Sequence, residues 1–201
     1  AWRERNPYKI ACIDRSTGRD VSYTQPMLAS LIRARRVGKL ERGRIGIMLP
    51  TSPGAALTIV GALMGGRTPV MINYSMGAEK NCRYAQQQCD FKVIVTTKAL
   101  LEKTACEQLP EMIFIEDILA NLSGFEKAIA LIKSKLPLPL LKRLTGPLNL
   151  DKPAVILFTS GSEREPKVVQ LTQRNILSNI DAFTDMMDIR KIGRASCRER
   201  V

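Results

Sequence analysis

The sequence contains no histidine, and none of its cysteines are paired at Cys-x-x-Cys spacing. Histidines and such cysteine pairs are the residues that most often bind zinc in proteins. Cys82 and Cys89 are seven residues apart, which fits two turns along one helix face. Two thiols without other soft ligands nearby make a poor metal site. The five cysteines are Cys12, Cys82, Cys89, Cys106 and Cys197. We therefore expect no metal site from these residues, and free thiols in a reducing cytoplasm.

Long apolar runs are also missing. The longest one, residues 55–64, is interrupted by Thr58 and Gly61 and is followed by two glycines. A membrane-spanning helix needs about 20 predominantly apolar residues, and nothing near Ala1 resembles a signal peptide. We therefore expect no membrane-spanning segment in this chain and a cytoplasmic location.

Aromatic residues make up only 5% of the chain, whereas basic residues exceed acidic ones and give a formal net charge of +12. Such a charge suggests an acidic partner, either nucleic acid or anionic lipid. The sequence lacks a helix-turn-helix pattern, an RNP-type aromatic strand and zinc ligands, which nucleic-acid-binding modules use. We therefore expect no nucleic-acid partner.

The last residues supply part of the positive charge. Residues 192–201 read IGRASCRERV, which is the translation of a common sequencing adapter, ATC GGA AGA GCG TCG TGT AGG GAA AGA GTG. We therefore assign residues 191–201 to this adapter and expect the protein domain to occupy residues 1–190. Residues 191–201 hold four basic residues and one acidic residue, so without them the net charge falls from +12 to +9.

Short apolar runs alternate with segments of helical periodicity through most of the chain. Strands that are apolar throughout and separated by helices favour a mostly parallel sheet covered on both faces. We therefore predict an α/β fold with a mostly parallel sheet flanked by helices. The expected strands are residues 9–14, 21–24, 44–49, 68–73, 92–96, 112–115 and 154–158, and the expected helices are residues 25–37, 53–64, 77–89, 98–108 and 172–187.

One segment, residues 119–150, interrupts this alternation. Its centre, residues 132–144, reads IKSKLPLPLLKRL and mixes leucines with basic residues. Pro137 and Pro139 exclude one continuous helix through it. Two interpretations stay open: a linker or surface helix that packs its leucines on the domain, or a surface for lipid at the inner face of the membrane or for an acidic carrier protein.

The segment richest in chemical groups is residues 154–179, AVILFTSGSEREPKVVQLTQRNILSN. An apolar strand runs into a loop in which hydroxyls, backbone N–H groups and a lysine can surround a polyphosphate. Gly161 lets the backbone approach a ligand closely, and Pro166 stiffens the chain before Lys167. The loop is not a Walker A loop, because the G-x-x-x-x-G-K-[ST] pattern is absent.

The order T-S-G-S-x-x-x-P-K directly after an apolar strand resembles the phosphate-binding signature of the adenylate-forming (AMP-binding) superfamily. Residues 44–73, RIGIMLPTSPGAALTIVGALMGGRTPVMIN, are similar to that family's early strand–helix–strand block, and residues 172–179 to the helix after its loop. Residues 73–75, residues 162–163 and the leucine-rich insertion most resemble the acyl-ACP synthetase/2-acylglycerophosphoethanolamine acyltransferase group. The resemblance implies the N-terminal part of the large domain of an adenylate-forming enzyme.

The resemblance also implies a reaction. A fatty-acid carboxylate attacks the α-phosphate of ATP, with Mg²⁺ as the usual counter-ion, and the acyl-adenylate passes its acyl group to the thiol of acyl carrier protein or CoA. The family's adenine-binding motif, magnesium-binding Glu, ribose-binding Asp and catalytic Lys all lie further along the chain, so no catalytic residue is assigned and we expect this chain alone to be inactive. The residues expected to bind or shape the site for the ATP phosphates are Thr159, Ser160, Gly161, Ser162, Glu163 and Lys167.

Three positions depart from the family pattern. Arg164 and Val168 stand where the family often has glycine, and Gln173 stands where it usually has histidine. A β-branched residue such as Val168 disfavours a positive φ angle. The alternative is therefore a non-catalytic nucleotide-binding homologue with a degenerate phosphate loop.

Overall fold

The structure is a computed structural model that describes residues 10–14, 19–22, 24–40, 42–75, 77–120, 122–135, 149–159 and 166–186. The strands are β1 (Ile10–Asp14), β2 (Arg19–Ser22), β3 (Arg44–Ile47), β4 (Thr68–Met71), β5 (Ile94–Thr96), β6 (Met112–Phe114), β7 (Pro153–Thr159) and β8 (Lys167–Thr172). The helices are α2 (Thr24–Leu40), α3 (Pro53–Met64), α4 (Ala78–Cys89), α5 (Lys98–Thr104), α6 (Ile115–Ala120), α7 (Gly124–Lys135) and α9 (Gln173–Met186).

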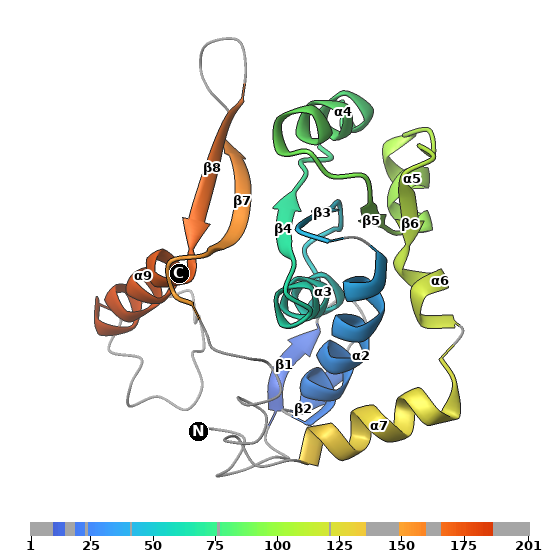
Figure 1. Ribbon diagram of the computed structural model, residues 1–201, viewed down its shortest axis with the longest axis vertical. Coiled ribbons are helices and arrows are strands. Elements are labelled where there is room, and N and C mark those ends of the chain that lie inside the picture. Colours follow the sequence, from blue (N-terminus) through green and yellow to red (C-terminus); the bar gives the residue numbers. More distant parts are fainter. Residues whose placement is uncertain are drawn as a thin grey trace, which may run out of the picture.

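Six of the strands form one sheet in the order β6-β5-β3-β4-β7-β8 (Figure 1). The pairs from β6 to β7 are all parallel, and only β8 runs antiparallel, against β7. The strands β1 and β2 form a separate antiparallel pair. The predicted α/β fold with a mostly parallel sheet flanked by helices is therefore confirmed.

Alternate residues of the central strand β3 point into two separate apolar cores. Ile45 and Ile47 are fully buried on one face, while Met48, just past the strand, is buried on the other. This alternation follows from the two-residue period of a strand. Burial of each such side chain stabilises the folded state by about 1.5–3 kcal/mol. Both helical layers are therefore needed for stability, because each covers one of the two cores.

The first core lies beneath α4 and α5, and the second lies beneath α2, α3 and α6. Cys82 and Cys89 of α4 are both buried in the first core, which confirms that they share one helix face. The first core contains Met48, Val70, Ile72, Ala78, Cys82, Ala85, Cys89, Phe91, Ile94, Leu100, Leu101, Leu109, Met112 and Ile156. The second core contains Val37, Ile45, Ile47, Leu49, Ala55, Ala62, Val95 and Ile118.

Helix α3 begins and ends where its sequence predicts. The Ser52 Oγ accepts a hydrogen bond from the Ala55 backbone N–H at 3.2 Å, which satisfies one N–H group of the first turn. Pro53 occupies the first position, where its missing N–H costs nothing. The chain leaves the helix at Gly65.

The end of the described chain differs from the prediction in one respect. We predicted residues 154–158 as the last strand, but residues 167–172 form a further strand, β8, which pairs with β7 as a hairpin. Val168 and Val169 are β-branched and suit this pairing. The final helix, α9, follows as predicted but has no buried residue.

The segment that interrupts the sequence pattern, residues 119–150, contains helix α7 and follows the short helix α6, and neither helix was predicted. Helix α7 packs against α2 and lies along the lower edge of Figure 1. Residues 136–148, which include Pro137 and Pro139, lie outside the described residues. Among the helices in the part of the chain that the structure describes, none is long and apolar enough to cross a membrane.

Candidate functional site

The carboxyl ends of the parallel strands meet at one edge of the sheet. From β3 the chain passes through α3 to β4 on one side, and then through α4 to β5 on the other side of β3. The strand order therefore reverses direction between β3 and β5. In open α/β sheets, ligands bind in the crevice that forms outside the carboxyl ends of the strands at such a point.

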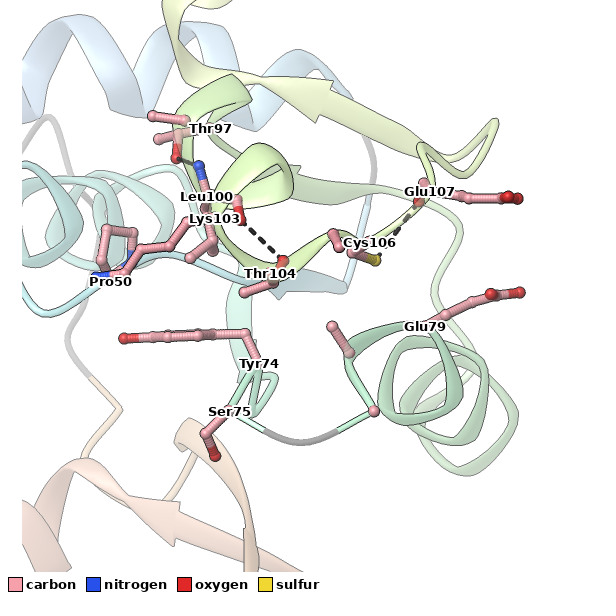
Figure 2. A pocket seen from close by; sticks show the side chains of 14 residues that line it. Pro50, Tyr74, Ser75, Glu79, Thr97, Leu100, Lys103, Thr104, Cys106 and Glu107 are labelled. Atoms are coloured by element: carbon pink, nitrogen blue, oxygen red, sulfur yellow. Dashed lines mark hydrogen bonds between the residues drawn. The ribbon is translucent and has the colours of Figure 1, made fainter.

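A pocket of about 890 Å³ lies at this edge (Figure 2). Tyr74 and Glu79 line one side, and Lys103 and Thr104 of α5 line the other. Its volume falls in the range of small-molecule sites, roughly 300–1,000 Å³. Among the described residues, the lining consists of Pro50, Tyr74, Ser75, Gly77, Ala78, Glu79, Thr97, Ala99, Leu100, Lys103, Thr104, Ala105, Cys106 and Glu107.

Of the predicted phosphate-binding residues, the structure describes only Thr159 and Lys167, and neither lines this pocket, which was not predicted from the sequence. A signal was present, because polar residues come soon after two strands: residues 73–75 lie two residues past the end of β4, and Thr97 directly follows β5. The order of the strands, which brings these residues together, cannot be read from that local pattern. Local hydrogen bonds hold the rim: the Asn73 Oδ1 accepts from the Ser75 N–H at 2.9 Å, and Asn81 donates to the Asn73 carbonyl at 2.9 Å.

The predicted phosphate loop joins β7 to β8. Thr159 and Lys167, at its two ends, face each other across the hairpin, and the Thr159 hydroxyl donates to the Lys167 carbonyl at 3.5 Å. Both residues are exposed. Because β7 is parallel to β4, they lie at the same edge of the sheet as the pocket. Ser160, Gly161, Ser162 and Glu163 lie outside the described residues.

Helix α4 holds the second end of this loop. The Tyr84 hydroxyl donates to the carbonyl oxygen of Pro166 at 2.8 Å. The Tyr84 ring also meets Phe158 of β7 edge-on, with ring centroids 5.9 Å apart and planes at 62°. One side chain therefore contacts β7 and the residue just before β8, next to Thr159 and Lys167 in sequence, and links the hairpin to α4.

The position of Val168 in the fold accounts for its departure from the family pattern. It stands where the family often has glycine, but it lies within the antiparallel strand β8 and packs partly buried against the first core. A strand is the conformation that a β-branched residue favours. Val168 is therefore compatible with an ordered hairpin and does not by itself indicate a degenerate loop.

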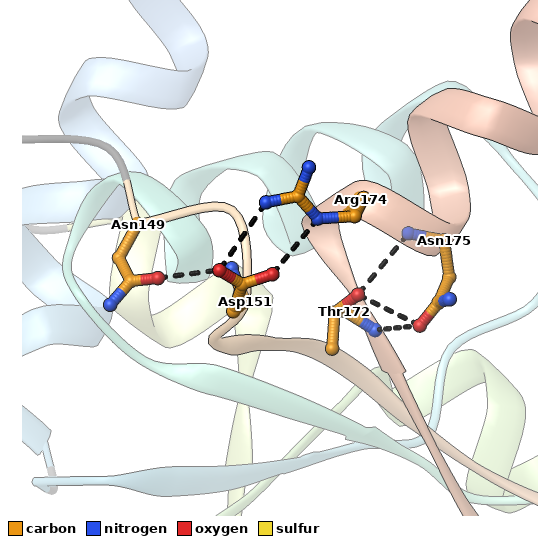
Figure 3. A network of polar contacts seen from close by, with 5 residues as sticks. All are labelled: Asn149, Asp151, Thr172, Arg174 and Asn175. Carbon is orange, nitrogen blue, oxygen red and sulfur yellow. Dashed lines mark hydrogen bonds and ion pairs between the residues drawn. The ribbon is translucent and has the colours of Figure 1, made fainter.

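The opposite end of the hairpin is fastened by polar contacts (Figure 3). Thr172 and Asn175 form reciprocal hydrogen bonds that cap α9: the Asn175 N–H donates to the Thr172 Oγ1 at 3.2 Å, and the Thr172 N–H donates to the Asn175 Oδ1 at 3.0 Å. Arg174 grips Asp151 through two hydrogen bonds of 2.9 and 3.3 Å. These bonds from Arg174 lower the pKa of the Asp151 carboxyl. The residues after the loop thus hold structure together rather than face the pocket.

Two of the three cysteines whose side chains the structure describes are sealed in the first core. Cys82 and Cys89 are buried, whereas Cys106 is half-buried in the pocket wall, and all three are free thiols, as predicted for this group. Burial raises the pKa of the Cys82 thiol to about 12. Within the described ranges, no cluster of three or more Cys, Asp or Glu side chains could hold a metal ion.

The sequence is similar to those of known enzymes. A family model described as "AMP-binding enzyme" matches residues 1–197. The chain is 25% identical to the acetyl-coenzyme A synthetase of Bacillus subtilis (strain 168), over 91% of this chain and 33% of that protein. It is 26% identical to 4-coumarate–CoA ligase 1 of Petroselinum crispum, over 88% of this chain and 32% of that protein. The chain therefore spans about a third of the length of these two curated relatives.

Solved structures give the same fold. The o-succinylbenzoate CoA synthetase of Bacillus subtilis, in complex with its acyl-adenylate intermediate, superposes with a TM-score of 0.69. The match covers 95% of this chain and 36% of that chain at 14% sequence identity. At this identity the likeness shows a shared fold alone.

Proposed function

Because the chain belongs to the AMP-binding enzyme family, we propose that the protein is an ATP-dependent ligase that activates a carboxylate as an acyl-adenylate. The carboxylate oxygen attacks the α-phosphorus of ATP, the bond to the bridging oxygen breaks, and pyrophosphate leaves. A thiol then attacks the acyl carbon, forms a thioester and releases AMP. The observation that carries this proposal is the position of Thr159 and Lys167, which face each other at the carboxyl edge of the sheet, the same edge at which the pocket lies.

In this proposal the loop between β7 and β8 holds the ATP phosphates. The ammonium group of Lys167 offsets the charge of the leaving pyrophosphate, and the Thr159 hydroxyl supplies a hydrogen bond. Ser160, Gly161, Ser162 and Glu163 complete the proposed loop. Mg²⁺, when bound, neutralises further phosphate charge.

The substrate that we propose is a fatty acid, and the acceptor is the thiol of acyl carrier protein or of CoA. The basis for acyl carrier protein is the resemblance of residues 73–75 and 162–163 to acyl-ACP synthetases. The basis for CoA is the similarity to two proteins named as a CoA synthetase and a CoA ligase. Fatty acids partition into bilayers, so we propose that the protein works in the cytoplasm beside the inner face of the membrane.

The test is fatty-acid-dependent exchange between ATP and labelled pyrophosphate, measured on the protein with its complete adenylation domain. We expect Lys167→Ala to lower the exchange rate by roughly a hundredfold, as for other donors that stabilise developing charge. The matched control is Lys152→Ala, which removes an exposed lysine at the opposite end of the same hairpin and should leave the rate unchanged.

The alternative, a non-catalytic nucleotide-binding homologue, predicts a different result. It would bind ATP, detectable by calorimetry, but would show no exchange with any carboxylate. Arg164, where the family often has glycine, is the sequence feature that favours it. Exchange that requires a fatty acid excludes this alternative, and exchange that Lys167→Ala leaves intact overturns the assigned role of the loop.

A further inference from the structure

Two helices of the protein expose large apolar side chains. On α7, Phe125 and Ile132 are 70% and 63% exposed, and Leu131 lies beside them. On α9, the exposed residues are Leu177, Ile180, Phe183 and Met186. Isolated exposed apolar residues are common, but a row of them along one helix face marks an interaction surface. The apolar faces of α7 and α9 differ in two respects: the contacts that fix each helix to the domain, and the net charge of each helix.

Helix α7 is fixed to the domain through its opposite face. Ser123 and Glu126 form a capping box: the Glu126 N–H donates to the Ser123 Oγ at 3.2 Å, and the Ser123 N–H donates to the Glu126 carboxylate at 3.3 Å. Arg36 of α2 donates a hydrogen bond to the same carboxylate, which lowers its pKa. Ala130 is buried on this side. The inner face of α7 thus packs against α2, and the outer face points away from α2.

The outer face carries an apolar stripe at helical spacing. Phe125, Ala128 and Ile132 follow one another at intervals of three and four residues, and all three are exposed. Leu131 widens the stripe at 46% exposure. Because α7 is anchored by its first turn, these side chains are presented together in one direction.

The outer face of α7 differs from the apolar face of α9 in the charge of the helix that carries it. Helix α7 holds three lysines, Lys127, Lys133 and Lys135, against the single Glu126, which is already paired with Arg36. The sequence then has no acidic residue until Asp151. Helix α9 instead holds two aspartates and one arginine. An apolar stripe with excess lysines is complementary to anionic lipid, whereas the apolar face of α9 carries the opposite charge balance.

We propose that the outer face of α7 rests on an anionic lipid bilayer, with Phe125 and Ile132 inserted at the level of the headgroups and the net positive charge of this segment of the sequence favouring anionic lipids. The helix has 12 residues and therefore lies in the interface and does not span it. The proposal does not depend on adenylate formation, since the surface is remote from the carboxyl edge of the sheet.

The test is flotation of this 201-residue chain with vesicles of phosphatidylcholine alone or mixed with phosphatidylglycerol. We expect binding to the mixed vesicles only, and release as salt is raised. The double variant Phe125→Ser/Ile132→Ser should bind about tenfold less, since it loses the inserted side chains. The matched control is Phe183→Ser/Ile180→Ser on α9, which removes the same two residue types from an equally open helix face and should bind like the parent chain.

Two further measurements test whether a change in binding comes from loss of folding or from the basic residues of 191–201. Both double variants should melt within a few degrees of the parent chain, because all four side chains are more than half exposed. A chain ending at residue 190 should bind as the full chain does, which removes the basic tail as the cause. The proposal is overturned if the α7 variant binds like the parent, if the α9 variant alone loses binding, or if removal of residues 191–201 abolishes it.

Discussion

Tyr84 illustrates how much one side chain outside the loop can control. Its hydroxyl holds the Pro166 carbonyl, and its ring holds Phe158, so it contacts both arms of the hairpin. Tyr84→Phe keeps the ring and removes the hydrogen bond, which typically contributes about 1 kcal/mol. We expect a small loss of thermal stability but a several-fold higher KM for ATP in pyrophosphate exchange, because Lys167 is less well positioned.

The variant Tyr84→Leu separates packing from positioning, since it loses the ring contact as well. It should reduce stability more than Tyr84→Phe does. An unchanged KM for ATP in Tyr84→Phe would show that the hydroxyl contributes to structure alone.

The thiols offer a second test at the residue scale. Burial raises the pKa of Cys82 to about 12 and also raises that of Cys106, so neither is readily ionised at neutral pH. Cys106, however, lies half-buried in the pocket wall, whereas Cys82 and Cys89 are sealed in the first core. With iodoacetamide at pH 8, we expect alkylation of Cys106 well before the other two, read by peptide mass spectrometry. Equal rates in the native protein would contradict the burial of Cys82.

At the scale of elements, the crossing of α2 and α3 depends on a glycine. A Cβ atom at Gly61 would lie 2.6 Å from the Cβ of Arg33, and backbone atoms of α2 lie 3.2 Å from the same point. Gly61→Ala therefore forces the helices apart, and overpacking of this kind costs about 1–3 kcal/mol. The measurement is urea unfolding of the purified chain.

The same helix supplies the control. At Gly54 a Cβ atom would meet nothing closer than the Ser52 Oγ at 3.7 Å. Gly54→Ala should leave stability unchanged or raise it by up to about 1 kcal/mol, since alanine is the better helix former. If the two variants are equally stable, α2 and α3 are not in close contact at Gly61.

At the scale of the whole molecule, the last described helix, α9, exposes its apolar side chains to solvent. It packs on β7 and β8 at the end of the hairpin opposite the predicted phosphate loop, and it has no buried residue. The chain also spans only about a third of the length of the acetyl-coenzyme A synthetase and the 4-coumarate–CoA ligase that it matches. We expect the 201-residue chain alone to form no acyl-adenylate when given ATP, Mg²⁺ and a fatty acid. Detection of acyl-AMP by mass spectrometry would contradict this expectation.

Local signals were sufficient for most of the fold. The Ser52-Pro53 start and Gly65 end of α3 were predicted correctly, because caps act within a few residues of the chain. The apolar strands were predicted correctly because burial on both faces leaves a continuous apolar run. The roles of the six phosphate-loop residues and the boundary at residue 190 stay predictions.

By itself, the sequence determined the alternation of strands and helices, the parallel sheet, and the resemblance carried by residues 159–167, since each depends on neighbours along the chain. Only the tertiary structure decided that residues 167–172 form a strand, because β7 supplies their hydrogen-bond partners. It also decided that Tyr74, Thr97 and Lys103 line one pocket. Their proximity follows from the strand order around β3, which is set by packing between segments distant in sequence rather than by any local pattern.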